Sequence, residues 1–232
     1  MRLVLGARSK TQSAIDTRPL DLSRLASVRE FAQGVIQELG DSLIDGLVLN
    51  AGTQFPNIDQ RTEDGFETTF AVNHLAHYLL LQLLLPKLAQ GATVVITTSD
   101  THDPKANPMG PKELDPEPLA HPPARHRPTG FSAGFRAYAA SKLCDLLMAR
   151  GLAASGEAKV KRFTVVAYNP GLTIGYRRSD PSDHASRYRG PGWSKPGRPG
   201  TRADNATRRT SVCIACQQKA DVARSIGACA PG

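Results

Sequence analysis

The alternation of apolar and polar positions along the chain predicts strands and helices in turn. Short, β-favouring apolar runs alternate with segments whose apolar residues recur at helical spacing. The runs expected to form strands are 3–8, 45–49, 92–99 and 163–168, and a further strand is expected to end at Asp21. The segments expected to form helices are 23–32, 62–88 and 134–148. This order is typical of an α/β protein with a doubly wound parallel sheet.

Polar residues at the helix starts support this reading. Ser23 is a good N-cap candidate, and Thr62 followed by Glu63 and Asp64 puts acid into the first turn of the long helix. Asn73 lies inside the apolar pattern of that helix, where an amide costs free energy unless it is hydrogen-bonded. A bond from Asn73 to a helix carbonyl would be a purely structural explanation.

Residues 100–130 interrupt the alternation. Their prolines and histidines exclude a single helix or strand. A long irregular segment is uncommon inside a compact domain unless it serves a purpose. We expect it to form a lid or rim beside a substrate.

Tyr138 and Lys142 are the most informative polar pair of the chain. They are four residues apart in a segment that reads as an amphipathic helix, so they lie one turn apart on one face. A free tyrosine has a pKa of about 10. An ammonium one turn away favours the phenolate and lowers that pKa toward the range in which tyrosine acts as a general acid or base. The same spacing also fits a tyrosine that only packs and a lysine that is only solvated.

The motifs around this pair resemble those of the short-chain dehydrogenase/reductase family, in the family's order, over about residues 3–173. They are Arg8 at a strand end, Asp21-Leu22, Asn50-Ala51-Gly52, Asn73, Ser99 at a strand end, Tyr138 with Lys142, and Asn169-Pro170-Gly171. The long insertion between Ser99 and Tyr138 is similar to that of retinol-dehydrogenase-like and protochlorophyllide-reductase-like members. The resemblance implies a Rossmann-like fold.

The resemblance also implies roles for four residues. Tyr138 would be the general acid/base, and Lys142 would lower its pKa while binding the nicotinamide ribose. Ser99 would orient the substrate oxygen. Asn73 would hold a water that links Lys142 to a proton relay.

The implied cofactor is NADP, with NAD as an alternative. Arg8 matches the family position that meets the adenosine 2′-phosphate, although a plain surface arginine is an alternative. Asp21 and Leu22 match the adenine pocket, and capping is an alternative explanation of Asp21. The remaining residues implied to contact the cofactor are Asn50, Ala51, Gly52, Tyr138, Lys142, Pro170, Gly171 and Thr173.

The chain departs from the family at its N-terminus. The family opens with a strand and a glycine-rich turn that holds the cofactor diphosphate at a helix start. This chain begins two residues before what resembles the second strand. The missing strand is the central one, so we expect nothing to join the strand ending at Arg8 to the strand ending at Asn50, and the Rossmann-like sheet to be incomplete at the N-terminus.

The chain also changes character at about Gly175. Residues 175–232 carry 11 lysines and arginines against 4 acidic residues, whereas residues 1–174 carry 18 against 17. We therefore expect a truncated dehydrogenase domain over 1–174 and a disordered basic tail over 175–232. RNA binding by the tail is a weaker alternative, because few aromatic residues interleave with its charges.

Metal sites are weak alternatives to this reading. His74 and His77 are three residues apart on one helix without a carboxylate or cysteine partner, and Cys213, Cys216 and Cys229 offer only three thiolates. We expect no metal. Four cysteines do not make a disulfide framework in a chain of this size.

The overall expectation is an NADP-dependent oxidoreductase that acts on a small carbonyl or alcohol substrate. The main alternative is a non-catalytic remnant that keeps the motif residues but holds no cofactor. No apolar run is long enough for a membrane span, and nothing resembles a signal peptide, so a cytoplasmic protein is expected. The family often forms homo-oligomers through the helices that hold Asn73 and Tyr138, and nucleic acid is not an expected partner.

Overall fold

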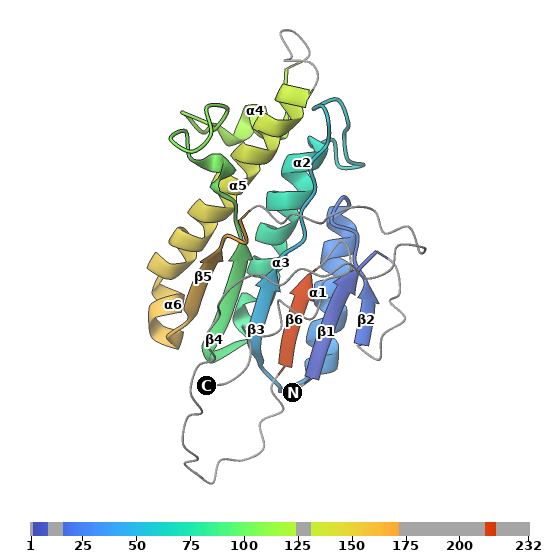
Figure 1. Cartoon of the computed structure of the whole chain (residues 1–232). Helices are drawn as coiled ribbons and strands as arrows, with labels where there is room; N and C mark the ends of the chain where they lie inside the picture. Colours follow the sequence, from blue (N-terminus) through green and yellow to red (C-terminus); the bar gives the residue numbers. More distant parts are fainter. Residues whose placement is uncertain (1, 9–15, 124–130, 172–211, 217–232) are drawn as a thin grey trace, which may run out of the picture.

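The computed structural model of the chain describes residues 2–8, 16–123, 131–171 and 212–216. Six parallel strands form one sheet in the order β2-β1-β6-β3-β4-β5 (Figure 1). The strands are β1 (Arg2–Ala7), β2 (Asp16–Pro19), β3 (Ile44–Leu49), β4 (Leu88–Thr97), β5 (Thr164–Tyr168) and β6 (Val212–Cys216). The predicted α/β class with a Rossmann-like parallel sheet is confirmed.

β6 lies between β1 and β3, although it comes from the far end of the chain (Figure 1). Its residues Val212–Cys216 pair with Arg2–Gly6 on one side and with β3 on the other. The expectation that nothing would join β1 to β3 is therefore wrong. Apart from β6, the predicted tail lies outside the described residues, so the division into 1–174 and 175–232 stays a prediction.

The signal for β6 was present in the sequence. Val212–Cys216 is the longest uninterrupted apolar run beyond residue 174. Parallel strands buried on both faces read as such continuous runs. The spacing of its two cysteines suggested a metal site instead of a strand. The Arg-rich segment before the run predicted disorder for the whole tail.

The helices α1, α3 and α5 pack in one layer on one face of the sheet, whereas α4 lies beyond the carboxyl ends of the strands (Figure 1). In this layer α1 contacts α3, and α5 contacts η1, β4 and β5. The helical elements are α1 (Leu25–Leu39), α2 (Thr68–Phe70), the π-helix η1 (Ala71–Leu75), α3 (Ala76–Leu84), α4 (Pro116–Ala120), α5 (Phe131–Ala154), α6 (Gly156–Lys161), and the 3₁₀ turns η2 (Leu85–Lys87) and η3 (Asp100–His102).

The helix predicted over 62–88 begins six residues later than expected, at Thr68. Thr62 and Gly65 form a turn, and the carboxylate of Glu67 accepts hydrogen bonds from the amides of Thr69 (2.9 Å) and Phe70 (2.7 Å). Glu67 is 1% exposed, and burial raises the pKa of its carboxyl group. The cap of this helix is therefore a buried acid rather than Thr62.

The N-terminus of α1 is also capped differently from the prediction. Arg24, not Ser23, is the N-cap residue, and its side chain makes no cap bond. The Leu25 amide instead donates to Asp64 Oδ2 at 2.9 Å, and Arg24 Nε donates to Glu63 Oε2 at 3.0 Å. Asp64, which was expected in the first turn of its own helix, thus caps α1 instead, and Glu63 binds the N-cap residue of α1.

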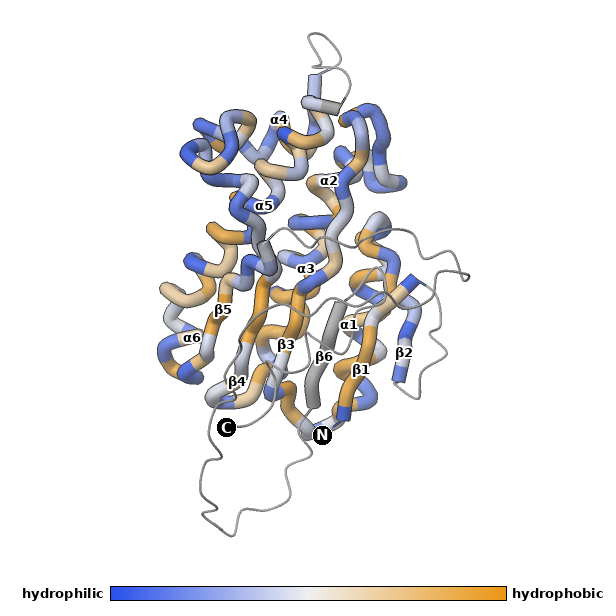
Figure 2. Tube along the Cα trace, in the orientation of Figure 1, coloured by the Kyte–Doolittle hydropathy of each residue, from blue (hydrophilic) through white to orange (hydrophobic). Residues whose placement is uncertain are grey.

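One buried apolar cluster fills the space between the helices and the sheet. Its strand residues include Val4, Leu47, Leu49, Val94 and Ile96, and its helix residues include Phe31, Val35, Leu80, Leu84 and Leu152. Figure 2 shows that the strands β1, β3 and β4 are hydrophobic, whereas the segments around α4 are largely hydrophilic. The strands thus form an apolar centre, and hydrophilic segments lie beyond their carboxyl ends.

Candidate active site

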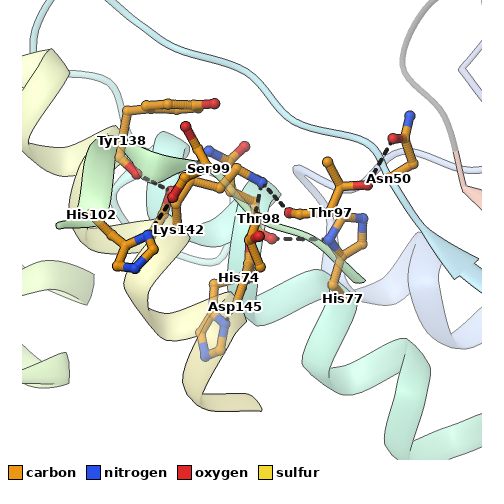
Figure 3. Close-up of polar contacts among 12 residues, drawn as sticks. Asn50, His74, His77, Thr97, Thr98, Ser99, His102, Tyr138, Lys142 and Asp145 are labelled. Atoms are coloured by element: carbon orange, nitrogen blue, oxygen red, sulfur yellow. Dashed lines mark hydrogen bonds and ion pairs between the residues drawn. The ribbon is translucent and has the colours of Figure 1, made fainter. Parts of the chain in front are cut away.

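Lys142 is anchored at the carboxyl end of β4. Its side chain is 3% exposed, and Nζ donates to the carbonyl oxygen of Thr97 at 2.8 Å and to Asp145 Oδ2 at 3.0 Å. Nζ lies 5.9 Å from the centroid of the Tyr138 ring. Tyr138 itself is half-buried. The predicted pair therefore exists as two neighbouring side chains of α5, with the cation held between the helix and the sheet (Figure 3).

Asp145 is a residue of this site that the sequence reading missed. Its carboxylate is buried; Oδ2 accepts from Lys142, and Oδ1 lies 3.2 Å from His74 Nδ1. Because a carboxylate only accepts, His74 Nδ1 carries the proton of this bond. The signal was an acid three residues after Lys142 inside an otherwise apolar helix stretch.

Asn73 ties the π-helix to the segment after β3. Its Oδ1 accepts from the Thr53 amide at 2.8 Å, and Nδ2 donates to the Thr53 carbonyl at 2.9 Å and to Ser141 Oγ at 3.0 Å. π-helical turns occur frequently at functional sites. Both donors and one of the two acceptor sites of the buried amide are thus used within the protein, and the relay water stays a prediction.

His77 is buried one turn after Asn73. Its Nδ1 lies 2.9 Å from the Asn73 carbonyl oxygen, so Nδ1 carries a proton and Nε2 carries a lone pair. Nε2 has no hydrogen-bond partner among the described residues. Burial lowers the pKa of His77 to about 4, which keeps the ring neutral.

Asn50 and Ser99 complete the edge of the sheet. Asn50 Oδ1 accepts from Thr97 Oγ1 at 2.8 Å, which joins the ends of β3 and β4. Ser99 lies two residues beyond β4 rather than on the predicted strand, and its Oγ accepts from the Thr101 amide at 3.3 Å. Because η3 packs against α5, Ser99 lies on the same side of the site as Tyr138 (Figure 3).

The residues predicted to contact the cofactor fall into separate groups. Exposed Arg8 follows β1, and Asp21 and buried Leu22 follow β2, on the other side of β6 from Asn50. The Asp21 carboxylate accepts from the amide of Ser23 at 2.9 Å, which makes it a turn-forming residue.

The other predicted contacts adjoin β3 and β5. Buried Ala51 and exposed Gly52 follow β3, and exposed Pro170 and Gly171 follow β5, where the Gly171 amide donates to Asn169 Oδ1 at 3.0 Å. Thr173 lies outside the described residues.

A cavity among the described residues lies near the candidate site but is not lined by Tyr138. It has a volume of about 600 Å³ and lies between α5 and the proline-rich segment. A rotation of about 100° per residue puts its α5 residues on the helix face away from Tyr138 and Lys142. The role of residues 100–130 as a lid or rim therefore stays a prediction. The cavity is lined by Ile58, Glu67, Pro108, Met109, Gly110, Pro111, Lys112, Glu113, Asp115, Pro118, Leu119, Pro122, Ala133, Arg136, Ala137 and Ala140.

The described residues offer no cluster of three or more potential metal ligands. In β6, Cys213 and Cys216 are three positions apart, so their Cα atoms are about 10 Å apart along the strand. Thiolates on one zinc ion each lie about 2.3 Å from the metal, which this spacing does not suit. Among the described helices, none is long and apolar enough to cross a membrane.

Comparison with known proteins agrees with the predicted family. Residues 4–109 match the family model of the short chain dehydrogenases. Over 158 residues the chain is 36% identical to human retinol dehydrogenase 14, an alignment that covers 67% of this chain and 41% of that protein. The chain therefore spans less than half the length of this relative.

Solved structures agree on the fold. The crystal structure of an uncharacterized protein from Mycobacterium paratuberculosis matches with a TM-score of 0.57 and 28% identity, covering 74% of this chain and 69% of that one. The NADPH-bound carbonyl reductase from chicken fatty liver matches with a TM-score of 0.50 and 20% identity, covering 73% and 68%, and shows the fold alone. In sequence and fold the chain is thus similar to the short-chain dehydrogenase/reductase family and, within that family, to the retinol dehydrogenases.

Proposed function

We propose that this chain is an oxidoreductase that moves a hydride between NADP(H) and the carbonyl or alcohol carbon of a small molecule. The observation that carries the proposal is the placement of Lys142. Its ammonium is fixed by Thr97 at the carboxyl end of β4 while it lies 5.9 Å from the Tyr138 ring centroid. Ligands of such sheets bind outside the carboxyl ends of the strands.

Each polar group at this edge has a proposed task. Tyr138 exchanges a proton with the substrate oxygen, and the Lys142 ammonium offsets the negative charge left on the tyrosine oxygen. The Ser99 hydroxyl, whose oxygen is held by the Thr101 amide, orients the substrate oxygen. A bound nicotinamide supplies or takes up the hydride.

The residues near Lys142 fit a nicotinamide ribose. An ammonium has three donors, and the described acceptors of Lys142, Thr97 and Asp145, use two of them. The third donor is available for a ribose hydroxyl. Exposed Gly52 lies beside the same ammonium, where a Cβ atom would be 3.6 Å from Nζ.

At the other end, the exposed guanidinium of Arg8 suits a phosphate. It follows β1 at the same edge of the sheet, and its planar group can bind phosphate through two donors. This is the basis for proposing NADP rather than NAD.

Between these two ends, the described part of the chain contains no glycine-rich turn that could hold a diphosphate. In the sequence that follows β6, the next glycine after Cys216 is Gly227. A glycine-rich turn at that position would bring backbone amides to the diphosphate. This observation favours a second candidate function, a non-catalytic protein that retains the motif residues without holding the cofactor.

The Tyr138→Phe variant tests the catalytic proposal. We expect turnover with NADPH to fall by about 100-fold or more, because general acid–base catalysis contributes that much, while NADPH affinity stays unchanged. Tyr78→Phe, which alters an exposed tyrosine of α3, is the matched control. Unchanged turnover in Tyr138→Phe would show that the assignment is wrong.

NADPH and NADH titrations test the cofactor proposal and the alternative. We expect Arg8→Ala to weaken NADPH binding by about 10-fold with little effect on NADH, because only NADP carries the additional phosphate. Arg29→Ala, at an exposed arginine of α1, is the control. A chain that melts cooperatively yet binds neither nucleotide would support the non-catalytic candidate.

A further inference from the structure

We propose that Asp145 and His74 carry protons between solvent and the buried ammonium of Lys142. The reduction of a carbonyl by NADPH consumes one proton from solvent. On this proposal that proton enters the protein at His74 and reaches Lys142 through the Asp145 carboxylate. The inference rests on the proposed function and deepens it, because both residues act through Lys142 rather than on the substrate itself.

Two successive hydrogen bonds join the three side chains, which Figure 3 shows together. Lys142 Nζ donates to Asp145 Oδ2 at 3.0 Å, and His74 Nδ1 donates to Asp145 Oδ1 at 3.2 Å. One oxygen of the carboxylate thus contacts the ammonium and the other contacts the imidazole. Both distances lie within the range over which positioned side chains exchange protons, so the route is continuous in the structure.

Exposure to solvent increases toward one end of this route. The side chains of Lys142 and Asp145 are 3% and 1% exposed, whereas the side chain of His74 is 16% exposed. His74 is therefore the member of the route that reaches solvent. An imidazole can take up a proton at one nitrogen and give one up at the other, which suits it to this position.

The other described polar groups around Lys142 cannot perform this task. The Thr97 carbonyl oxygen accepts from Nζ at 2.8 Å but has no proton to pass on. Asn73 carries an amide, and both of its donors are used within the protein. His77 is 0% exposed, and its Nδ1 donates to the Asn73 carbonyl oxygen, so it does not reach solvent. Among the described groups bonded to Nζ, Asp145 alone can hold a proton.

Two aromatic rings hold the His74 imidazole in place. Phe70 precedes it by four residues and Tyr78 follows it by four, with ring centroids 5.5 Å and 6.2 Å from the centroid of His74. Residues at this spacing lie on one face of a helix, so the three rings form a row. This row supports the ring in the position in which Nδ1 meets Asp145 of α5.

The proton transfer leaves every group in its starting state. When Lys142 releases a proton toward Tyr138, Nζ becomes a neutral amine. His74 takes a proton from water at Nε2 and passes its Nδ1 proton to Asp145 Oδ1. A half-turn of the carboxyl group about its Cβ–Cγ bond gives this proton to Nζ, which restores the ammonium and the carboxylate. The imidazole regains its first tautomer by exchange with water, so one proton has moved from water to Tyr138.

Exchange of the Lys142 ammonium protons with water tests the route without nucleotide or substrate, by NMR on protein with isotope-labelled lysine. We expect His74→Gln to slow this exchange by about 10-fold or more, because a positioned acid–base group contributes at least that much and glutamine takes up no proton. Looser packing would speed the exchange instead. His121→Gln, at an exposed histidine, is the matched control and should keep the parent rate. An unchanged or faster rate in His74→Gln would overturn the proposal.

Chemical rescue of turnover gives the second test. We expect His74→Ala to lower turnover with NADPH by about 10-fold or more with unchanged NADPH affinity, and added imidazole to restore most of the loss. His121→Ala should keep the parent rate with and without imidazole. Parent turnover in His74→Ala, or a loss that imidazole does not restore, would overturn the proposal. If the parent chain has no turnover while His74→Gln slows exchange at Lys142, the proton route stands and the proposed function fails.

Discussion

The Lys142 ammonium and the Asp145 carboxylate form a buried ion pair, with Nζ 3.0 Å from Oδ2 and side chains that are 3% and 1% exposed. Both belong to one turn of α5, so forming the pair brings no distant segments together. Its effect is instead to fix the direction of Lys142. With Asp145 on one side and the Thr97 carbonyl on the other, the ammonium remains at the end of β4.

Removal of one partner of this pair should destabilise the protein strongly. In Asp145→Leu the Lys142 charge stays buried without its counter-ion, and the free energy of unfolding should fall by about 3 kcal/mol or more. The double variant Asp145→Leu/Lys142→Met should recover most of this loss. Urea denaturation of the two single variants and the double variant measures the coupling.

The pair formed by Lys161 and Glu157 in α6 serves as a control. It has the same charge types at 3.3 Å, but the side chains are 29% and 38% exposed. Glu157→Gln should change the free energy of unfolding by about 1 kcal/mol or less. If Asp145→Leu lowers the free energy of unfolding by no more than Glu157→Gln does, the buried pair does not stabilise the fold as expected.

His77 should make the protein lose stability on acidification. Burial lowers its pKa to about 4, and this outweighs the nearby Asp145 carboxylate, which acts in the opposite direction. The unfolded chain takes up the proton near pH 6.5 and the folded protein only near pH 4, so stability falls as the pH decreases between these values.

The size of this effect can be measured by urea denaturation from pH 7.5 to pH 4. The shift from 6.5 to about 4 corresponds to roughly 3 kcal/mol. A His77→Gln variant carries no titrating ring at this position, so its loss of stability over the same range should be smaller by about that amount. Parallel curves for the two proteins would contradict the assignment.

The sequence predicts the sheet well where strands are continuous apolar runs. β1, β3, β4 and β5 begin or end within a few residues of their expected bounds, because each is an apolar, β-favouring run bounded by polar residues. β6 was not predicted, because its position depends on a gap that exists only once β1 and β3 are in place. The apolar run of five residues indicates a strand, but it does not indicate the two distant strands with which that strand pairs.

The helix ends and the site show the same difference between local and distant causes. The Tyr138–Lys142 neighbourhood follows from helical spacing alone and could be predicted. The bond by which Asp64 caps α1 joins residues 39 positions apart, so no local pattern predicts it. The bond from Asn73 to Ser141 spans 68 positions and likewise has no local signal.

Cys144 should be unreactive in the folded protein. Burial raises the pKa of its thiol to about 12, so the reactive thiolate is nearly absent at pH 8. Iodoacetamide at pH 8 should leave Cys144 unmodified in the folded chain and modify it in urea, as measured by peptide mass spectrometry. Equal modification in the two states would show that the apolar cluster of Cys144 with Phe70 and Ala120 is open to solvent.

Gly134 should be irreplaceable by alanine, in contrast to Gly151 of the same helix. A Cβ atom at Gly134 would lie 2.0 Å from the Phe55 carbonyl oxygen and 2.7 Å from the Pro56 carbonyl carbon, whereas nothing lies within 4 Å of a Cβ at Gly151. Helix propensity alone favours alanine at both positions by about 0.5–1 kcal/mol. We expect Gly151→Ala to raise the melting temperature and Gly134→Ala to lower it, since backbone atoms cannot give way without moving the segment that Asn73 holds through Thr53. Stabilisation by both substitutions would mean that α5 does not pack against this segment as described.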